Sequence, residues 1–251
     1  MLSRRPYARH NRGRVSRGGG GGEATPYNYA NLLTWLDAND LALGAGSAWA
    51  AKAGSNGTLV ASPTVSDGWT GGRRMVTLNG TSQYLTIDGI ASAISGEDQP
   101  FSIALVYQFT ANTANYAVLW AANRSATSTP KFEFYKLNTA GAAFQQYNQD
   151  DGVGTASANA GAADTNTHVL VCSCTGTAFS SWFNGSIAHN ATAANVGVRT
   201  LDLFTVGAIR RGGTASVFAP ARICEVVCWS SAIGSGGAAS EYARLAAKWG
   251  V

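Results

Sequence analysis

The sequence has few of the features that mark membrane, secreted or metal-binding proteins. Of its 251 residues only 13% are charged, and it has three histidines and four cysteines. No segment approaches the ~18 consecutive apolar residues that span a bilayer, so we expect no membrane contact. The charged N-terminus is not followed by the apolar run of a secretory signal, so we expect synthesis in a reducing cytoplasm.

Motifs of the common enzyme classes are missing as well. There is no G-x-S-x-G elbow for a nucleophilic serine, and the glycine run at 18–22 lacks the strand and the Lys-Ser/Thr of a phosphate loop. Retaining glycosidases need two carboxyl groups about 5–5.5 Å apart, which alternate acidic residues on one strand would supply. The adjacent pairs Glu97-Asp98 and Asp150-Asp151 lack that spacing. We therefore expect no enzyme activity, no catalytic residue and no cofactor.

The first 22 residues contain no carboxylate. The chain carries 18 basic and 14 acidic residues, six of the basic ones in this segment, so the remainder holds 12 against 14 and has a net charge of −2. Arginine and glycine offer no apolar surface to bury, which predicts an extended arm. We predict an arm and linker over residues 1–26, one domain over residues 27–251, and an acidic partner for the arm. The arginines expected to bind that partner are Arg4, Arg5, Arg9, Arg12, Arg14 and Arg17.

Beyond the arm, short strand-like runs recur at intervals of about ten residues, which is typical of an all-β sandwich or barrel. The clearest runs are MVTLNG, SQYLTIDG, FSIALVYQF, YAVLWAA, KFEFYKL, AAFQQYN, HVLVCSC, AFSSWFNG, LDLFTVG and ARICEVVCWS. The dipeptides Asn79-Gly80 and Asn184-Gly185 predict hairpin turns.

The C-terminal segment SEYARLAAKWG has a different period. Tyr242, Leu245 and Trp249 recur at the spacing of one helical face, and Gly250 stands where a C-cap would be. We therefore predict a short helix that covers part of the sandwich.

The four cysteines fall in two close pairs. Cys172 and Cys174 share one strand face, and so do Cys224 and Cys228, so neither pair can easily bridge within itself. Neither pair has the C-x2-C form of a zinc knuckle. We expect four buried free thiols, and a disulfide between the two pairs is the alternative.

Several segments together resemble laminin-G-like domains of the concanavalin A-like lectin and glucanase group. LLTWLDAND resembles their opening strand, VTLNGTSQYL an early strand pair, and THVLVCSCTGTAFSSWFNGS their later hairpin. ARICEVVCWSSAIG and SEYARLAAKWG are similar to their ending, so the likeness covers about residues 33–250. Phe218-Ala219-Pro220 departs from the pattern because it lacks the usual glycine in that turn.

The resemblance implies an antiparallel jelly-roll β-sandwich with a short C-terminal helix behind the basic arm. The shared pattern includes Trp35, Trp229 and Trp249, which we expect in the core. His168 also stands at a shared position, and we expect it to have a structural role. Glu225 is expected to make an internal hydrogen bond. Some laminin-G-like domains bind calcium at a rim of loops, for which the candidate ligands are Asp67, Asp88, Asp150 and Asp151. The candidate aromatic residues for glycan binding are Trp69, Trp120, Tyr135 and Tyr147.

Laminin-G-like modules occur in phage virion proteins, so the first hypothesis is a non-enzymatic virion protein of a bacteriophage, either a capsid decoration or a fibre-type component. Its arm would bind other virion proteins, the major capsid protein or neighbouring subunits, and we expect a homo-oligomer or many copies. The alternative is a carbohydrate-binding adhesion module of a cell-surface or host-recognition protein. A second alternative is a coat protein whose arm binds packaged nucleic acid.

Overall fold

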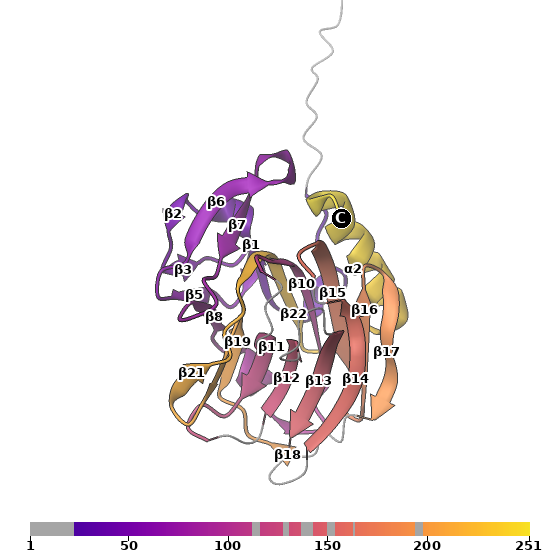
Figure 1. Ribbon diagram of the computed structural model, residues 1–251. Helices are drawn as coiled ribbons and strands as arrows, with labels where there is room; N and C mark the ends of the chain where they lie inside the picture. Colours follow the sequence, from indigo (N-terminus) through magenta and orange to yellow (C-terminus); the bar gives the residue numbers. More distant parts are fainter. Residues whose placement is uncertain are drawn as a thin grey trace, which may run out of the picture.

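The computed structural model describes residues 23–111, 116–127, 131–136, 143–149, 154–162, 164–193 and 198–251. Figure 1 shows two layers of antiparallel strands with one long helix at the side. No helix among the described residues combines the length and apolar character that a membrane crossing requires.

The first sheet has ten strands. They are β1 (Leu32–Asp37), β2 (Gly44–Ala45), β4 (Ala53–Gly54), β6 (Thr64–Trp69), β7 (Arg73–Thr77), β10 (Phe101–Phe109), β15 (Thr167–Cys174), β16 (Ala178–Phe183), β17 (Ser186–Ala193) and β22 (Ala221–Trp229). Their order is β17-β16-β15-β10-β22-β7-β6-β2, and β1 pairs with β22 and β4.

The second sheet has eight strands. They are β3 (Ala48–Trp49), β5 (Gly57–Val60), β8 (Tyr84–Ile87), β11 (Ala117–Asn123), β12 (Lys131–Lys136), β13 (Ala143–Gln149), β14 (Gly154–Ala162) and β19 (Leu203–Val206), in the order β14-β13-β12-β11-β19-β8-β5-β3. Two small ribbons pair β9 (Gly96–Glu97) with β18 (Val198–Arg199) and β20 (Ile209–Arg211) with β21 (Thr214–Ser216).

Aromatic side chains join the two sheets into one core. Trp120 of the second sheet meets Phe101 of the first edge-on, with ring centroids 6.0 Å apart. Phe134 of the second sheet contacts Phe179 and Phe183 of the first at 6.4 and 6.1 Å. These rings are buried on both sides of the interface, which is the packing of a sandwich. The predicted all-β sandwich is thereby confirmed.

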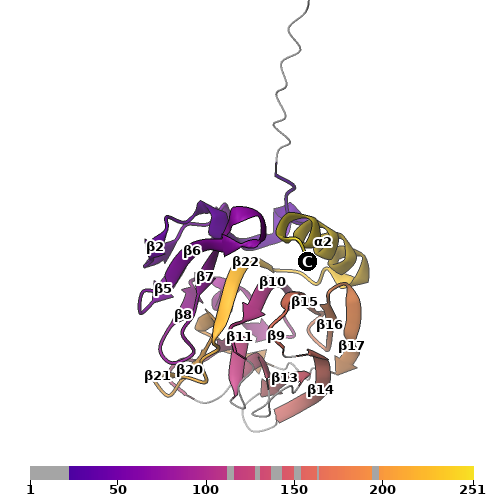
Figure 2. The same ribbon diagram turned by 45° about the horizontal axis from the view of Figure 1, so that its top comes forward.

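The remaining elements are helical. They are α1 (Ile90–Ala93), α2 (Gly234–Trp249) and the 3₁₀ turns η1 (Tyr29–Asn31), η2 (Ala38–Asp40) and η3 (Thr70–Gly72). Helix α2 packs against β15 and β10, on the outer face of the first sheet (Figure 2).

The predicted C-terminal helix is confirmed and extends further than its apolar pattern indicated. It begins at Gly234, in a glycine-rich stretch with weak helix propensity, and ends at Trp249, with Gly250 as its C-cap at a φ of 73°. Leu245 and Trp249 are buried as expected, whereas Tyr242 is only half-buried. The buried stripe instead includes Glu241, whose charge is paired as described below.

One of the two predicted hairpins is wrong. Strand β7 pairs with β6 and β22, while β8 pairs with β5 and β19, so the Asn79-Gly80 turn carries the chain from one sheet to the other. The Asn79 side chain accepts hydrogen bonds from the N–H groups of Thr81, Ser82 and Gln83, which holds a wider loop than a two-residue turn. The Asn184-Gly185 hairpin is confirmed, because β16 and β17 pair directly across it.

Strands that the sequence did not indicate lie at sheet margins. Strand β14 forms the edge of the second sheet and reads GTASANAGA, which has no large apolar residue and no alternation. The short strands between residues 44 and 60 are two to four residues long, too short to show a period. Edge position and short length therefore explain why a periodicity argument misses them.

All four cysteines are free and buried. Strand β10 separates the two pairs, since Ile103 lies opposite Cys172 on one side and Cys228 on the other. Strands two places apart in a sheet are about 9.5 Å apart, beyond the reach of a disulfide. Burial also raises the pKa of Cys172, Cys224 and Cys228 and so suppresses the reactive thiolate.

We expect a thiol reagent to modify none of the cysteines rapidly in the native protein and all four in denaturant, because access requires unfolding. Titration with a chromogenic disulfide reagent, with and without guanidinium chloride, measures both counts. Rapid native modification, or fewer than four thiols in the denatured protein, would contradict this arrangement.

Candidate functional site

A single buried carboxylate organises one face of the first sheet. Glu225, in β22, is fully buried and accepts four hydrogen bonds. Its Oε1 accepts from Trp35 Nε1 and Arg244 Nη2, each at 2.7 Å. Its Oε2 accepts from Trp249 Nε1 and Lys248 Nζ, also at 2.7 Å. A carboxylate offers about four lone-pair sites, so Glu225 is saturated by two neutral and two charged donors. The expectation of an internal bond at Glu225 is confirmed.

Strand register and helix period together place these donors. Strand β1 pairs with β22 so that Asp37 lies opposite Glu225 and Trp35 opposite Val227. On α2, Glu241, Arg244 and Lys248 follow at the spacing of one helical face. The helix therefore brings one acidic and two basic side chains over the Asp37 and Glu225 carboxylates.

Two lysines hold the remaining carboxylates together. Lys248 Nζ contacts Asp37 Oδ2 at 2.6 Å, bonds Glu225, and also bonds Glu23. Lys52 Nζ bonds Glu23 and lies 3.0 Å from Asp37 Oδ2. An ammonium group has three donors, and Lys248 directs them at three carboxylates. The carboxylates of Glu23, Asp37 and Glu225 lie close enough for a metal site, but the Lys248 ammonium already bridges all three.

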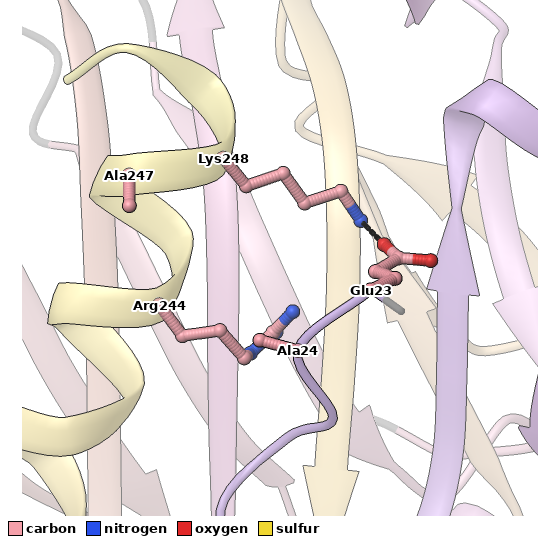
Figure 3. A pocket seen from close by; sticks show the side chains of 5 residues that line it. All are labelled: Glu23, Ala24, Arg244, Ala247 and Lys248. Carbon is pink, nitrogen blue, oxygen red and sulfur yellow. Dashed lines mark hydrogen bonds and ion pairs between the residues drawn. The ribbon is translucent and has the colours of Figure 1, made fainter. Parts of the chain in front are cut away.

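We call residues 23–27 the arm root, because they connect the arm to the domain. Figure 3 shows Lys248 reaching from α2 to Glu23 and Arg244 reaching toward Ala24. Tyr27 N–H donates to Glu241 Oε2 at 3.0 Å, and Tyr27 C=O accepts from Trp229 Nε1 at 2.6 Å. A Cβ on Gly237 would meet the Tyr27 ring at 2.7 Å, so only glycine allows this approach. Side chains from α2 and β22 thus fix both ends of the arm root.

The cluster that surrounds Glu225 contains more negative than positive groups. Its carboxylates are Glu23, Asp37, Asp40, Glu225 and Glu241, and its cations are Lys52, Arg244 and Lys248. The Trp35 ring lies among the cations, with Lys52 Nζ at 5.2 Å and the Arg244 guanidinium at 5.6 Å. These contacts add cation–π attraction to the ion pairs.

Three groups of the cluster, Asp37, Lys52 and Lys248, have pKa values shifted toward their charged forms, whereas burial raises the pKa of Asp40. Burial tends to raise the pKa of Asp37, but its bonds to Lys248 and Asn39 outweigh this and lower the pKa. Burial tends to lower the pKa of Lys52 and Lys248, but their carboxylate partners outweigh it and raise both pKa values. Asp37, Lys52 and Lys248 therefore stay charged near neutral pH.

A pocket of about 310 Å³ lies beside the arm root. Glu23, Ala24, Arg244, Ala247 and Lys248 line it (Figure 3). Arg244 Nη1 is buried and has no hydrogen-bond partner among the described residues. An added anion would nevertheless increase the local excess of negative charge, so we assign this pocket no ligand. The cluster is built to hold elements together, because its buried acids and bases are committed to one another.

A second, larger concavity lies at the other end of β22, and we call it the groove. Its volume is about 620 Å³, which is in the range of small-ligand sites. It is lined by Asn79, Gly80, Thr81, Thr110, Ala111, Tyr116, Val217, Phe218 and Pro220. None of these residues carries a formal charge at neutral pH.

Two of the predicted glycan-binding residues belong to the core. Trp120 is fully buried, and Trp69 is 6% exposed and donates its Nε1–H to the Trp249 carbonyl at 3.0 Å. Neither ring faces solvent, so their assignment as exposed glycan platforms is corrected. The side chains of Tyr135 and Tyr147 lie outside the described residues.

The predicted core residues are buried, whereas the described candidates for calcium binding are exposed. Trp35, Trp229 and Trp249 are buried as expected. His168 is buried too, and it contacts Asp164 Oδ1 at 2.7 Å and Asn184 Nδ2 at 3.2 Å, as a structural residue would. Asp67 and Asp88 are exposed and belong to no cluster of metal-ligating side chains among the described residues. The six arm arginines, Asp150 and Asp151 lie outside the described residues.

The sequence reasoning missed most of the cluster around Glu225. Lys52 and Asp37 lie near the start of the chain and Arg244 and Lys248 near its end, so no local motif unites them. One available signal was the helix period, which places Glu241, Arg244 and Lys248 on one face beside the apolar stripe.

Sequence comparison assigns the chain to no family. No family model matches it, and no curated protein matches it significantly. Solved structures do match its fold. A Trypanosoma rangeli sialidase in complex with sialic acid aligns with a TM-score of 0.63 at 12% identity over 87% of this chain. The chain spans about a third of that sialidase, 33% of its length.

Receptor-binding domains match as well. The binding domain of botulinum neurotoxin DC, in complex with rat synaptotagmin II, aligns with a TM-score of 0.63 at 6% identity, over 86% of this chain and 52% of that one. The receptor-binding domain of the botulinum neurotoxin C/D mosaic serotype aligns with a TM-score of 0.61 at 9% identity, over 85% and 51%. These likenesses establish a shared β-sandwich fold.

Replacing Glu225 by glutamine should destabilise the protein by about 3–5 kcal/mol, because it leaves buried cations without their counter-charge. The matched control is Glu97→Gln on the exposed strand β9, which should change the stability by less than about 0.5 kcal/mol. Urea unfolding followed by tryptophan fluorescence gives both free energies. Equal stability of the two variants would show that Glu225 does not hold the cluster.

Stability should also fall at both pH extremes. The pKa of Asp37 is below its ordinary 3.8, so its stabilisation is present above pH 3.8 and is lost as the pH drops through the folded value. The pKa values of Lys52 and Lys248 are above 10.5, so their stabilisation is present below that pH and is lost on further alkalinisation. Unfolding free energies measured across this range should form a plateau, and Asp37→Asn should flatten its acidic flank. An unchanged acidic flank in Asp37→Asn would contradict the assignment.

Proposed function

We propose that this protein is a non-enzymatic binding module that its arginine arm attaches to an assembled surface, such as a virus particle. The proposal rests on two features that occur together. Six arginines without a carboxylate precede residue 23, and the residues that follow are fixed to the domain by Glu23 and Tyr27. A tail without a role would need no such attachment to α2 and β22.

The arm chemistry favours an acidic protein surface as the partner. A guanidinium remains charged and pairs bidentately with carboxylates, so spaced arginines can follow a line of acidic side chains. The glycine run between Arg17 and Glu23 supplies a flexible tether. Ordering such an arm costs conformational entropy, so several copies on one particle would make the attachment stable.

The groove and the arm root lie at opposite ends of β22, which is the arrangement that display on a particle requires. The groove adjoins Pro220, directly before β22, whereas the arm root bonds to Trp229, the last residue of the strand. Nine residue steps lead from Pro220 to Trp229, which is about 30 Å at the rise of a β-strand. In Figures 1 and 2, α2 and the C-terminus lie at the upper right and β21, beside the groove, at the lower left. An arm held at one end would leave the groove facing away from the particle.

The acidic groups are paired within the protein, and this favours binding over catalysis. The buried carboxylates of Asp37, Glu225 and Glu241 are paired with lysine, arginine or indole donors, and the described residues that line the groove include no carboxylate, histidine, lysine or arginine. Two of the structural neighbours are described as binding domains of a neurotoxin, which is consistent with this fold serving recognition. The proposal therefore includes no hydrolytic role.

Deleting residues 1–22 should leave a folded domain that no longer attaches to its particle, because the cluster that fixes the arm root begins at Glu23. The test offers full-length and truncated protein to particles that lack the protein, and measures the bound fraction after sedimentation. Replacing all six arginines by lysine is the matched control, and it should weaken attachment less than replacing them by serine.

Two results would overturn the proposal. Equal attachment of the truncated domain would show that the sandwich itself holds the particle. Release of the full-length protein by nuclease treatment would show that the arm binds packaged nucleic acid rather than an acidic protein surface.

A further inference from the structure

We propose that the groove binds an uncharged saccharide, with the ring of Tyr116 as its platform. This inference deepens the proposed binding function by naming a ligand class and a site. Tyr116 is 47% exposed, one of the few large apolar side chains of the described residues that face solvent. It lines the groove together with threonine hydroxyls and backbone groups.

The walls of the groove are held by hydrogen bonds within the protein. The Asn79 side chain is occupied by three backbone N–H groups of its own loop. Gly80 lies against Pro220, because a Cβ there would meet the proline at 2.8 Å. Thr110 N–H and its hydroxyl both donate to the Pro220 carbonyl, at 2.8 and 3.1 Å. The β7–β8 loop, the end of β10 and the start of β22 therefore form a preorganised surface, which lowers the entropic cost of binding.

Backbone strain lies at the same place. Val217 has a φ of 57°, and it is the only β-branched residue among the described non-glycine residues with positive φ. That conformation is costly for a branched side chain. It is maintained because the Val217 carbonyl accepts from Val118 N–H at 3.0 Å and its side chain packs on Val118, Ala121 and Ile209. Strain of this kind gathers at binding sites. It also falls beside the turn where the sequence departs from the laminin-G-like pattern.

The composition of the groove selects the ligand. It has no formal charge, so an anion or cation would lose its hydration there without gaining an ion pair. A sugar ring presents an apolar C–H face to an aromatic ring and hydroxyls at its rim. Tyr116 and Phe218 supply apolar surface, while the exposed Thr81 and Thr110 hydroxyls can accept from sugar hydroxyls. A ligand with alternating apolar and hydroxyl surface, an uncharged saccharide, matches all of these features.

The test uses the full chain and a panel of uncharged oligosaccharides with glucose, galactose, mannose and N-acetylglucosamine units, with sialyllactose as an acidic comparison. Isothermal titration should find binding to at least one uncharged member and weaker or no binding to sialyllactose. Tyr116→Ala should lower that affinity by about tenfold or more. Thr81→Lys, a change at an exposed position, should abolish it by placing a bulky charge in the groove.

The matched control is Tyr29→Ala, because Tyr29 is equally exposed at 49% but lies in η1 at the arm root end, and this variant should bind as the wild type does. Melting temperatures should confirm that all variants fold. Binding should also be unchanged between about 0.05 and 0.5 M salt, since no ion pair is involved, whereas arm-mediated attachment should weaken.

Three outcomes would refute the inference. In the first, the wild type binds no uncharged member of the panel. In the second, Tyr116→Ala and Thr81→Lys bind the saccharide as tightly as the wild type does. In the third, the wild type binds sialyllactose alone. In the last two cases the protein still binds glycans and the arm-deletion result still stands, so the proposed function survives while the groove assignment fails.

Discussion

The structure depends on the burial of one carboxylate. Glu225 lies in the middle of the central strand β22, where an unpaired charge would cost several kcal/mol. The fold meets this constraint by bringing two indoles and two cations to its oxygens, from β1 and from α2. Because these donors come from both ends of the chain, satisfying Glu225 also fixes where the helix and the first strand lie.

The arm root is a consequence of the same constraint. Lys248 pairs with Asp37 and Glu225, and Lys52 pairs with Asp37, so both lysines also reach Glu23, while Glu241 accepts from the backbone of Tyr27. The chain is thereby fixed at the residue where the arginine arm ends. Glu23 and Tyr27 are thus bonded to side chains of α2 and β22. The groove, at the far end of β22, is left independent of that attachment.

Residue pattern predicted the parts of the fold in which local sequence and tertiary environment agree. β10 and β22 are buried on both faces and are rich in β-branched and other apolar residues, although β22 also contains Arg222 and Glu225, and both strands were predicted within a residue or two. The Asn79-Gly80 turn was misjudged because a turn dipeptide does not reveal which strand its neighbours pair with. Trp69 and Trp120 were misjudged because the type of a residue does not reveal its exposure. The partners of Glu225 lie up to 190 residues away along the chain, so only the folded structure brings them together.

The most direct test of this account is hydrogen exchange at the indole N–H groups of Trp35 and Trp249, followed by NMR. Both donate to Glu225 in the core, so their protons should exchange only through global unfolding, at the rate of the slowest backbone amides of β10 and β22. In Glu225→Gln both indole protons should exchange faster relative to those amides. Rapid exchange of the two indoles in the wild type, while the strand amides remain protected, would show that Glu225 does not hold the helix and the first strand together.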